Sequence, residues 1–203
     1  MTLRDHARGA VRDEVAKQAW TLFATQGFEA TTVDQIAEAA GMSRRTFFRY
    51  FAGKDELVLE RLVESATLIA TALRARPADE AAWPALRAAF DVSIELQETH
   101  ADKSRPLQVM LRAEPALRAT AETRRRLWVE LLAPLTAERL PPAATEGPDV
   151  RATAVTASAI SCLEAAQVTW AASPGTSLGT LLDQAMTAVS PLPPATPPQD
   201  VGT

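Results

Sequence analysis

The chain has 203 residues, 47% hydrophobic and 5% aromatic, which suits one or two small helical domains with a sizeable core. The single Cys162 excludes an internal disulfide framework, and the isolated His6 and His100 give no metal-ligand spacing, so we expect no metal or cofactor. No apolar run reaches roughly 18 residues and the start MTLRDHARGA lacks an apolar signal core, so we expect a cytoplasmic protein that neither spans a membrane nor is exported.

The first predicted helix ends at Gly27. Its inner face is marked at helical spacing by Val15, Ala19, Leu22 and Phe23. Gly27 can adopt the left-handed conformation that ends a helix, and Phe28 can fold back as the hydrophobic contact of that cap. We therefore expect one amphipathic helix before Gly27.

A short second helix is predicted between Thr32 and Gly41. The Thr32 hydroxyl can accept from the Gln35 amide while Gln35 reaches back, which is a capping box. Ile36, Ala37 and Ala40 follow as an apolar stripe, and Gly41 can stop the helix.

A third helix is predicted to begin after Ser43, a good N-cap residue. Its separation from the second helix by Gly41 and Met42 fits the turn of a helix-turn-helix. Phe47 and Phe51 lie four residues apart and should face inward. Outward or flanking positions then fall to Arg44, Arg45, Phe48, Arg49, Tyr50 and Lys54. Guanidinium groups can bond guanine edges in the major groove, while Tyr hydroxyl and Lys ammonium groups suit phosphates.

The stretch TVDQIAEAAGMSRRTFFRYFAGKDEL from Thr32 to Leu57, preceded by LFATQGF, resembles the DNA-binding domain of TetR-family transcriptional regulators. The resemblance implies an all-helical protein that binds a double-stranded DNA operator as a homodimer. The family typically has Tyr where this chain has Phe48, so we expect Phe48 to pack on a thymine methyl or a sugar. The DNA-binding candidates are Thr32, Ser43, Arg44, Arg45, Thr46, Phe48, Arg49, Tyr50 and Lys54.

The net charge of −4 is unevenly distributed. Residues 1–54 carry eight Lys and Arg against six Asp and Glu, so this part has a charge of +2 and the remainder −6. The asymmetry directs the N-terminal part toward phosphate. The excess is small, so affinity must depend on where the charges stand.

Further helices are predicted over 54–76, 84–100, 104–112, 115–140, 150–172 and 177–189. Pro134 lacks an amide donor and should kink or break its helix near Glu130. The last segment has five prolines in the eight residues after Ser190 and should be a disordered tail.

The predicted helices 150–172 and 177–189 are rich in small and apolar residues, with Glu164 as the one acid of the central stretch. A helix with so little polar surface must be covered on more than one side. The family resemblance implies that these two helices form a four-helix dimer interface with a second subunit. The alternative is that they only complete the core of one chain.

The run RRTFFRYFAGKDEL, together with the segment from Arg105 to Arg118, resembles TetR regulators whose C-terminal domain is likened to the mycofactocin regulator and to binders of acyl-CoA-like ligands. The apolar candidates for a pocket wall are Phe90, Met110, Trp128, Leu131, Leu135 and Trp170. For each of them, ordinary core packing is the alternative.

The remaining polar candidates each have two interpretations. Arg105, Arg112 and Arg118 can meet an acidic ligand group or form a solvated face. We expect residues 124–126, an Arg triplet, to lie on a charged outer face. We expect Cys162 to be a small buried hydrophobic residue rather than a redox sensor.

No glycine-rich phosphate loop, G-x-S-x-G elbow or metal cluster is present in the sequence, so we expect no enzymatic activity. We predict an all-α protein with a helix-turn-helix DNA-binding domain at 1–54, a ligand-binding and dimerisation domain at 55–190 and a tail at 191–203. It should be a repressor released by a small hydrophobic or acyl-CoA-like effector. The alternative is a DNA-binding regulator or architectural factor without a ligand.

Overall fold

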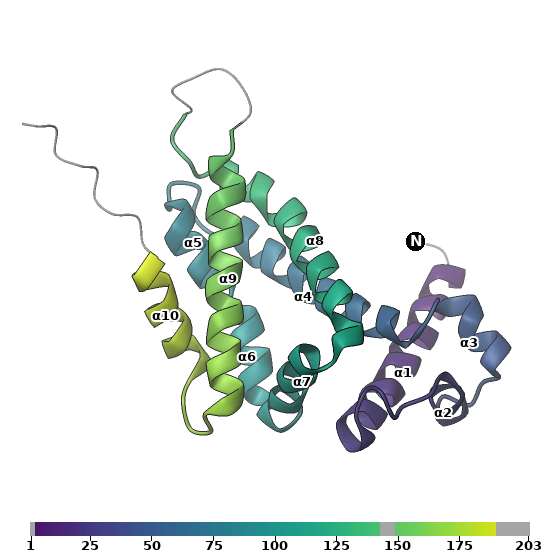
Figure 1. The fold of residues 1–203 in the computed structure, drawn as a ribbon. Coiled ribbons are helices and arrows are strands. Elements are labelled where there is room, and N and C mark those ends of the chain that lie inside the picture. Colours follow the sequence, from purple (N-terminus) through teal and green to yellow (C-terminus); the bar gives the residue numbers. More distant parts are fainter. Residues whose placement is uncertain (1–2, 143–148, 190–203) are drawn as a thin grey trace, which may run out of the picture.

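The computed structural model describes residues 3–142 and 149–189, and every regular element within these ranges is helical (Figure 1). This confirms the predicted all-α fold, while the proposed tail 191–203 lies outside the described residues. The N-terminal helices, here called the head, are α1 (Leu3–Gln26), α2 (Val33–Ala39) and α3 (Arg44–Tyr50). The helix α4 (Lys54–Ala75) runs from the head into the rest of the molecule. The other helices, here called the body, are α5 (Ala82–Ala89), α6 (Asp91–Thr99), α7 (Ala101–Ala113), the 3-10 turn η1 (Pro115–Leu117), α8 (Arg118–Ala137), α9 (Arg151–Ala172) and α10 (Leu178–Val189). In the described part of the chain, none of these helices is long and apolar enough to cross a membrane.

The head is held together by a small aromatic core. Phe23, Phe28, Phe47 and Phe51 are buried, and the ring centroids of Phe47 and Phe51 lie 5.3 Å apart. The predicted turn at Gly27 is confirmed, since its φ of 86° is a left-handed value that glycine adopts without strain. Sequence spacing alone placed these aromatics correctly, because helical periodicity decides which side chains share a face.

Helix α4 belongs to both cores of the molecule. Its first half contributes Leu57 and Leu62 to the head core, and its second half contributes Ile69 and Leu73 to the body core. From the body, α7 adds Leu111 to the head core. The head is therefore attached to the body by packed apolar side chains as well as by the chain itself.

The body core is formed mainly where α8 packs on α4 and on α9, with α10 lying along α9 (Figure 1). Trp170, Phe90 and Leu132 are among its largest fully buried side chains. The indole of Trp128 donates to the Leu62 carbonyl of α4 over 2.8 Å, which ties α8 to the linking helix.

Two helix boundaries differ from the sequence expectation. The predicted helix 84–100 is two helices, α5 and α6, which meet at Phe90, and α5 begins before Pro84, whose missing amide is tolerated in a first turn. Of the kink or break expected at Pro134, the break does not occur, since α8 continues to Ala137. Buried neighbours on both sides of it, Leu132 and Leu135, keep this turn packed despite the lost hydrogen bond.

Candidate nucleic-acid interface and ligand cavity

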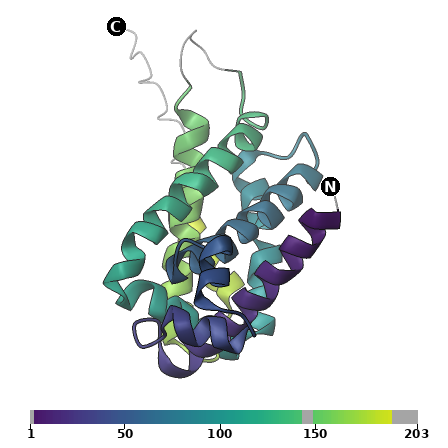
Figure 2. The same ribbon diagram turned by 90° about the vertical axis from the view of Figure 1, so that its right-hand side faces the viewer.

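The recognition helix α3 begins at a capped serine. The Thr46 amide donates to the Ser43 hydroxyl over 3.1 Å, and the two hydroxyls lie 2.9 Å apart. Phe47 anchors the helix in the head core, while Phe48 is 47% exposed. Figure 2 views the molecule with the head in front of the body. The capped start and the buried anchor hold α3 firmly enough to present its remaining side chains.

Three arginines of α3 are exposed to solvent. Arg44 pairs with Asp34 over 2.8 Å, but both side chains are more than half exposed. Such a pair contributes only about 0–1 kcal/mol, so DNA can compete for the guanidinium. Arg45 has no ion pair within the described ranges, and Arg49 stacks near the Tyr50 ring. The predicted readers of bases are therefore available.

Thr32 and Lys54, predicted as DNA contacts, also have partners inside the head. The Thr32 capping box is confirmed, since the Gln35 amide donates to the Thr32 hydroxyl and the Thr32 amide to the Gln35 side chain. The Lys54 ammonium group donates to the carbonyls of Phe28 and Thr31 over 2.6 and 3.0 Å. Lys54 thus closes the turn between α1 and α2, a role that no local sequence pattern indicated.

A cavity of about 760 Å³ lies between the head and the body. On one side it is lined by α1 and α4, and on the other by α6, α7, α8 and one residue of α9. Its apolar wall is formed chiefly by Trp20, Phe23, Leu62, Leu107, Met110 and Trp128. This volume is in the range of small-molecule sites, which are typically ~300–1,000 Å³.

The predicted ligand residues separate into two groups. Met110 and Trp128 line the cavity. The other four do not line it: Phe90, Leu135 and Trp170 are buried in the body core, and Leu131 packs against that core. Sequence reasoning also missed Trp20, because a tryptophan on α1 is easily assigned to the head core alone.

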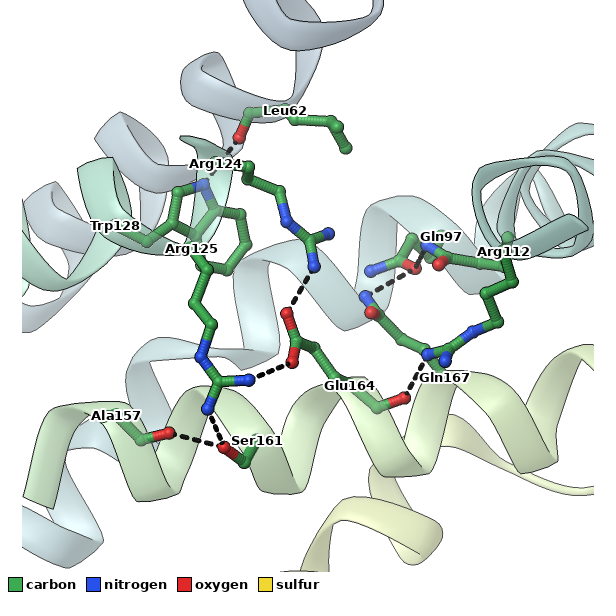
Figure 3. Close-up of polar contacts among 11 residues, drawn as sticks. Leu62, Gln97, Arg112, Arg124, Arg125, Trp128, Ala157, Ser161, Glu164 and Gln167 are labelled. Atoms are coloured by element: carbon green, nitrogen blue, oxygen red, sulfur yellow. Dashed lines mark hydrogen bonds and ion pairs between the residues drawn. The ribbon is translucent and has the colours of Figure 1, made fainter. Parts of the chain in front are cut away.

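The expectation that residues 124–126 lie on a charged outer face is wrong for Arg124, whereas Arg125 and Arg126 are exposed. Arg124 is 9% exposed and lies 2.5 Å from the Glu164 carboxylate, which also pairs with Arg125 over 3.1 Å (Figure 3). Helical spacing puts Arg124 on the same face as the buried Trp128, so it points toward α9, and Glu164 supplies the opposite charge there. Arg126 pairs with Glu130 at an exposed site.

Arg105 and Arg112 also bond within the body. Arg105 donates to the Trp170 carbonyl and lies 4.2 Å above the Trp170 ring. Arg112 donates to the Glu164 carbonyl over 2.7 Å. Burial lowers the pKa of the Arg112 guanidinium, and the charge of Glu164 opposes this effect. These two side chains therefore hold α7 against α9, whereas Arg118 remains exposed.

Cys162 is buried in the body core, and burial raises the pKa of its thiol. A neutral thiol is a weak nucleophile, so this environment favours the interpretation as a small hydrophobic residue.

Two family models match the chain. Residues 16–60 match the bacterial regulatory proteins of the tetR family, and residues 80–192 match the MftR C-terminal domain. In fold, the chain is similar to Thermus thermophilus FadR, a TetR-family repressor in complex with lauroyl-CoA, with a TM-score of 0.60 and 24% identity over 91% of this chain and 98% of that one.

Two relatives extend the match in sequence. The regulator TcmR of Streptomyces glaucescens is 42% identical over 88 residues, which span 43% of this chain and only 39% of TcmR. The putative mycofactocin biosynthesis regulator MftR of Mycobacterium tuberculosis is 30% identical over 139 residues, 65% of this chain and 67% of MftR. Since the two models together cover the head and the body, the chain belongs to the TetR family of transcriptional regulators.

Proposed function

We propose that this regulator is a repressor that binds a palindromic operator as a homodimer and leaves it when a small hydrophobic or acyl-CoA-like effector fills the cavity between head and body. The exposed arginines of α3 read the bases, and Thr32, Ser43, Thr46 and Tyr50 contact the backbone of the DNA. Two heads related by two-fold symmetry meet half-sites about one helical turn apart, or a multiple of it. Phosphate neutralisation makes the binding weaken steeply with salt.

The cavity between head and body is the observation that carries the sensor function. An occupant touches Trp20 and Phe23 of the head as well as Leu107 and Trp128 of the body. It therefore favours whichever angle between head and body gives it the better contacts. A coupling of ~1–3 kcal/mol between effector and operator corresponds to a change of roughly 5- to 150-fold in DNA affinity.

The outer sides of α9 and α10 support a homodimer. Val168 and Val189 are exposed there, and the exposed positions of α9 beyond Arg151 are small or apolar rather than charged. An uncharged helix surface of this kind is typical of a subunit interface. The predicted pairing of these two helices with their copies in a second subunit remains part of the proposal.

The proposed effector class is based on the residues that line the cavity and on the similarity in fold to FadR. FadR is in complex with lauroyl-CoA, a long apolar chain with a polar head group. The cavity of this chain combines an apolar wall with charged residues such as Lys17 and Lys103. Lauroyl-CoA is therefore a suitable first probe for this chain.

The test measures operator release in the presence of lauroyl-CoA for two variants of α7. Leu107→Trp fills the cavity, whereas Val109→Trp adds the same bulk at a position that is 54% exposed and does not line it. We expect both variants to bind the operator and only Leu107→Trp to lose the release. Equal release by both variants would show that the effector acts elsewhere, and the absence of release in the parent protein at all probe concentrations would favour a regulator without a ligand of this class.

A further inference from the structure

Three glutamines from three different helices meet beside the cavity. Gln97 of α6 accepts at its side-chain oxygen from the amide groups of Gln108 on α7 and Gln167 on α9, each over 3.1 Å. The Gln97 amide nitrogen donates to the carbonyl and the hydroxyl of Ser93. Figure 3 shows Gln97 and Gln167 turned toward each other between α6 and α9. All four residues line the cavity, and Ser93 with Gln97, Gln108 and Gln167 is here called the amide cluster.

The orientation of each amide follows from one backbone group. The Ser93 carbonyl can only accept, so the nitrogen of Gln97 must face it and the oxygen of Gln97 must face the other two glutamines. Gln108 and Gln167 must then direct nitrogen toward Gln97 and keep their oxygens on the opposite side.

Gln97 is saturated, but its two partners are not. Gln108 and Gln167 each use one N–H, and their side-chain oxygens and second N–H groups have no partner within the described ranges. Both side chains are buried, with 6% and 4% exposure. Because both residues line the cavity, these groups can bond a ligand in place of water, and one neutral hydrogen bond gained in this way corresponds to about a tenfold change in affinity.

Arg12 and Arg124, which line the cavity, already have carboxylate partners. Arg124 lines the cavity and pairs with Glu164, on the same helix as Gln167, over 2.5 Å. Its Nε–H is buried without an acceptor. Arg12, farther along the wall, is paired with Glu56 and Glu60. A carboxylate at the amide cluster would lose its hydration and meet arginines that are already paired, and none of the four residues of the cluster carries a positive charge. A neutral group that donates to the free oxygens and accepts from the free N–H groups fits instead.

We propose that the amide cluster recognises a neutral donor-and-acceptor group, a hydroxyl or a primary carboxamide, at the end of an otherwise apolar ligand. The ligand donates to the side-chain oxygen of Gln108 or Gln167 and accepts from a remaining N–H, while its apolar part lies against Trp20, Met110 and Trp128. This inference rests on the proposed function only in taking the cavity as the effector site.

The test compares four probes with the same apolar chain: octanamide, 1-octanol, methyl octanoate and octanoate. Binding is followed by tryptophan fluorescence, since Trp20 and Trp128 line the cavity, and by calorimetry. Octanamide and 1-octanol should bind about tenfold more tightly than methyl octanoate, which cannot donate, and than octanoate. Octanoate binding as tightly as octanamide, or no probe binding at all, would overturn the proposal.

Matched variants assign the preference to the amide cluster. Gln167→Met removes one amide at similar volume and leaves Gln97 bonded to Gln108, so the fold should persist with an unchanged or slightly higher melting temperature. This variant should weaken the tenfold preference, and Gln108→Met combined with Gln167→Met should abolish it, whereas Val109→Met, outside the cavity, should keep it. A preference that survives in the double variant would contradict the assignment.

Operator release separates this inference from the proposed function. Selective octanamide binding without any effect on the operator would leave the amide cluster as a binding site and refute the sensor function. Release by lauroyl-CoA together with equal binding of all four probes would support the sensor function and refute the amide preference.

Discussion

In the recognition helix, Arg44, Arg45 and Arg49 stand exposed with weak partners or none within the described ranges, whereas in the body Arg105 and Arg124 bond to carbonyls and carboxylates of distant helices. The two regions use one residue type for opposite purposes. Exposed guanidinium groups cost little to redirect, so they are available to a DNA groove. The body arginines hold helices together, and the buried Arg124 cannot be released from Glu164 without leaving a charge unpaired.

Removing the Glu164 carboxylate should have the largest effect on stability. Glu164→Leu leaves Arg124 buried without a countercharge, and we expect the free energy of unfolding to fall by ~3–5 kcal/mol. Chemical denaturation measures it, with Glu130→Leu as the control, because Glu130 pairs with Arg126 at an exposed site. A loss as small as that of the control would mean that Arg124 finds water or another partner.

Lys54 lies in the head, as the α3 arginines do, but it bonds to buried backbone carbonyls. It therefore tests whether the position of a cation in the head or its hydrogen bonds determine how much it contributes to stability. Lys54→Met removes the donor to the Phe28 and Thr31 carbonyls, and we expect a loss of ~1.5–3 kcal/mol in stability. It should also weaken binding to operator and random DNA alike, as expected of a phosphate contact. Lys17→Met, at an exposed ion pair, is the control. Unchanged thermal unfolding of Lys54→Met would contradict the bonding role.

The exposed arginines should behave in the opposite way. Arg44→Ala or Arg45→Ala should cost ~1–3 kcal/mol in operator binding and relax the preference at one position of each half-site. The thermal stability should barely change, because neither side chain is buried. Binding to operator and random DNA, measured in parallel, decides the point: equal losses on both would remove these arginines from base reading.

The smallest effect is expected at the exposed pair Asp149 and Arg151. Hydrogen bonds from Arg151 lower the pKa of Asp149 from 3.8 to about 2. Because the folded-state pKa is depressed, the pair stabilises the protein above pH ~4 and the contribution is lost as the pH falls toward about 2. Unfolding curves of the parent and Asp149→Asn should differ slightly at neutral pH and converge in acid. A difference that grows with acid would show the opposite sign.

The sequence alone predicted the head well, because its determinants are local. The capping box of Thr32 with Gln35, the turn at Gly41 and the cap at Ser43 each depend on residues at most three apart, so short-range geometry decides them. The spacing of Phe47 and Phe51 similarly assigned the inner face of the recognition helix.

Only the tertiary structure decided the body's polar contacts and the place of the cavity. Arg124 meets Glu164 and Gln97 meets Gln167 across 40 and 70 residues of sequence. Four of the six residues predicted to line the pocket lie in or against the body core instead, and Trp20 of the head lines the cavity. Helical periodicity gives the face on which a side chain lies, but the helix packed against that face determines whether the side chain meets a partner, a core or a cavity.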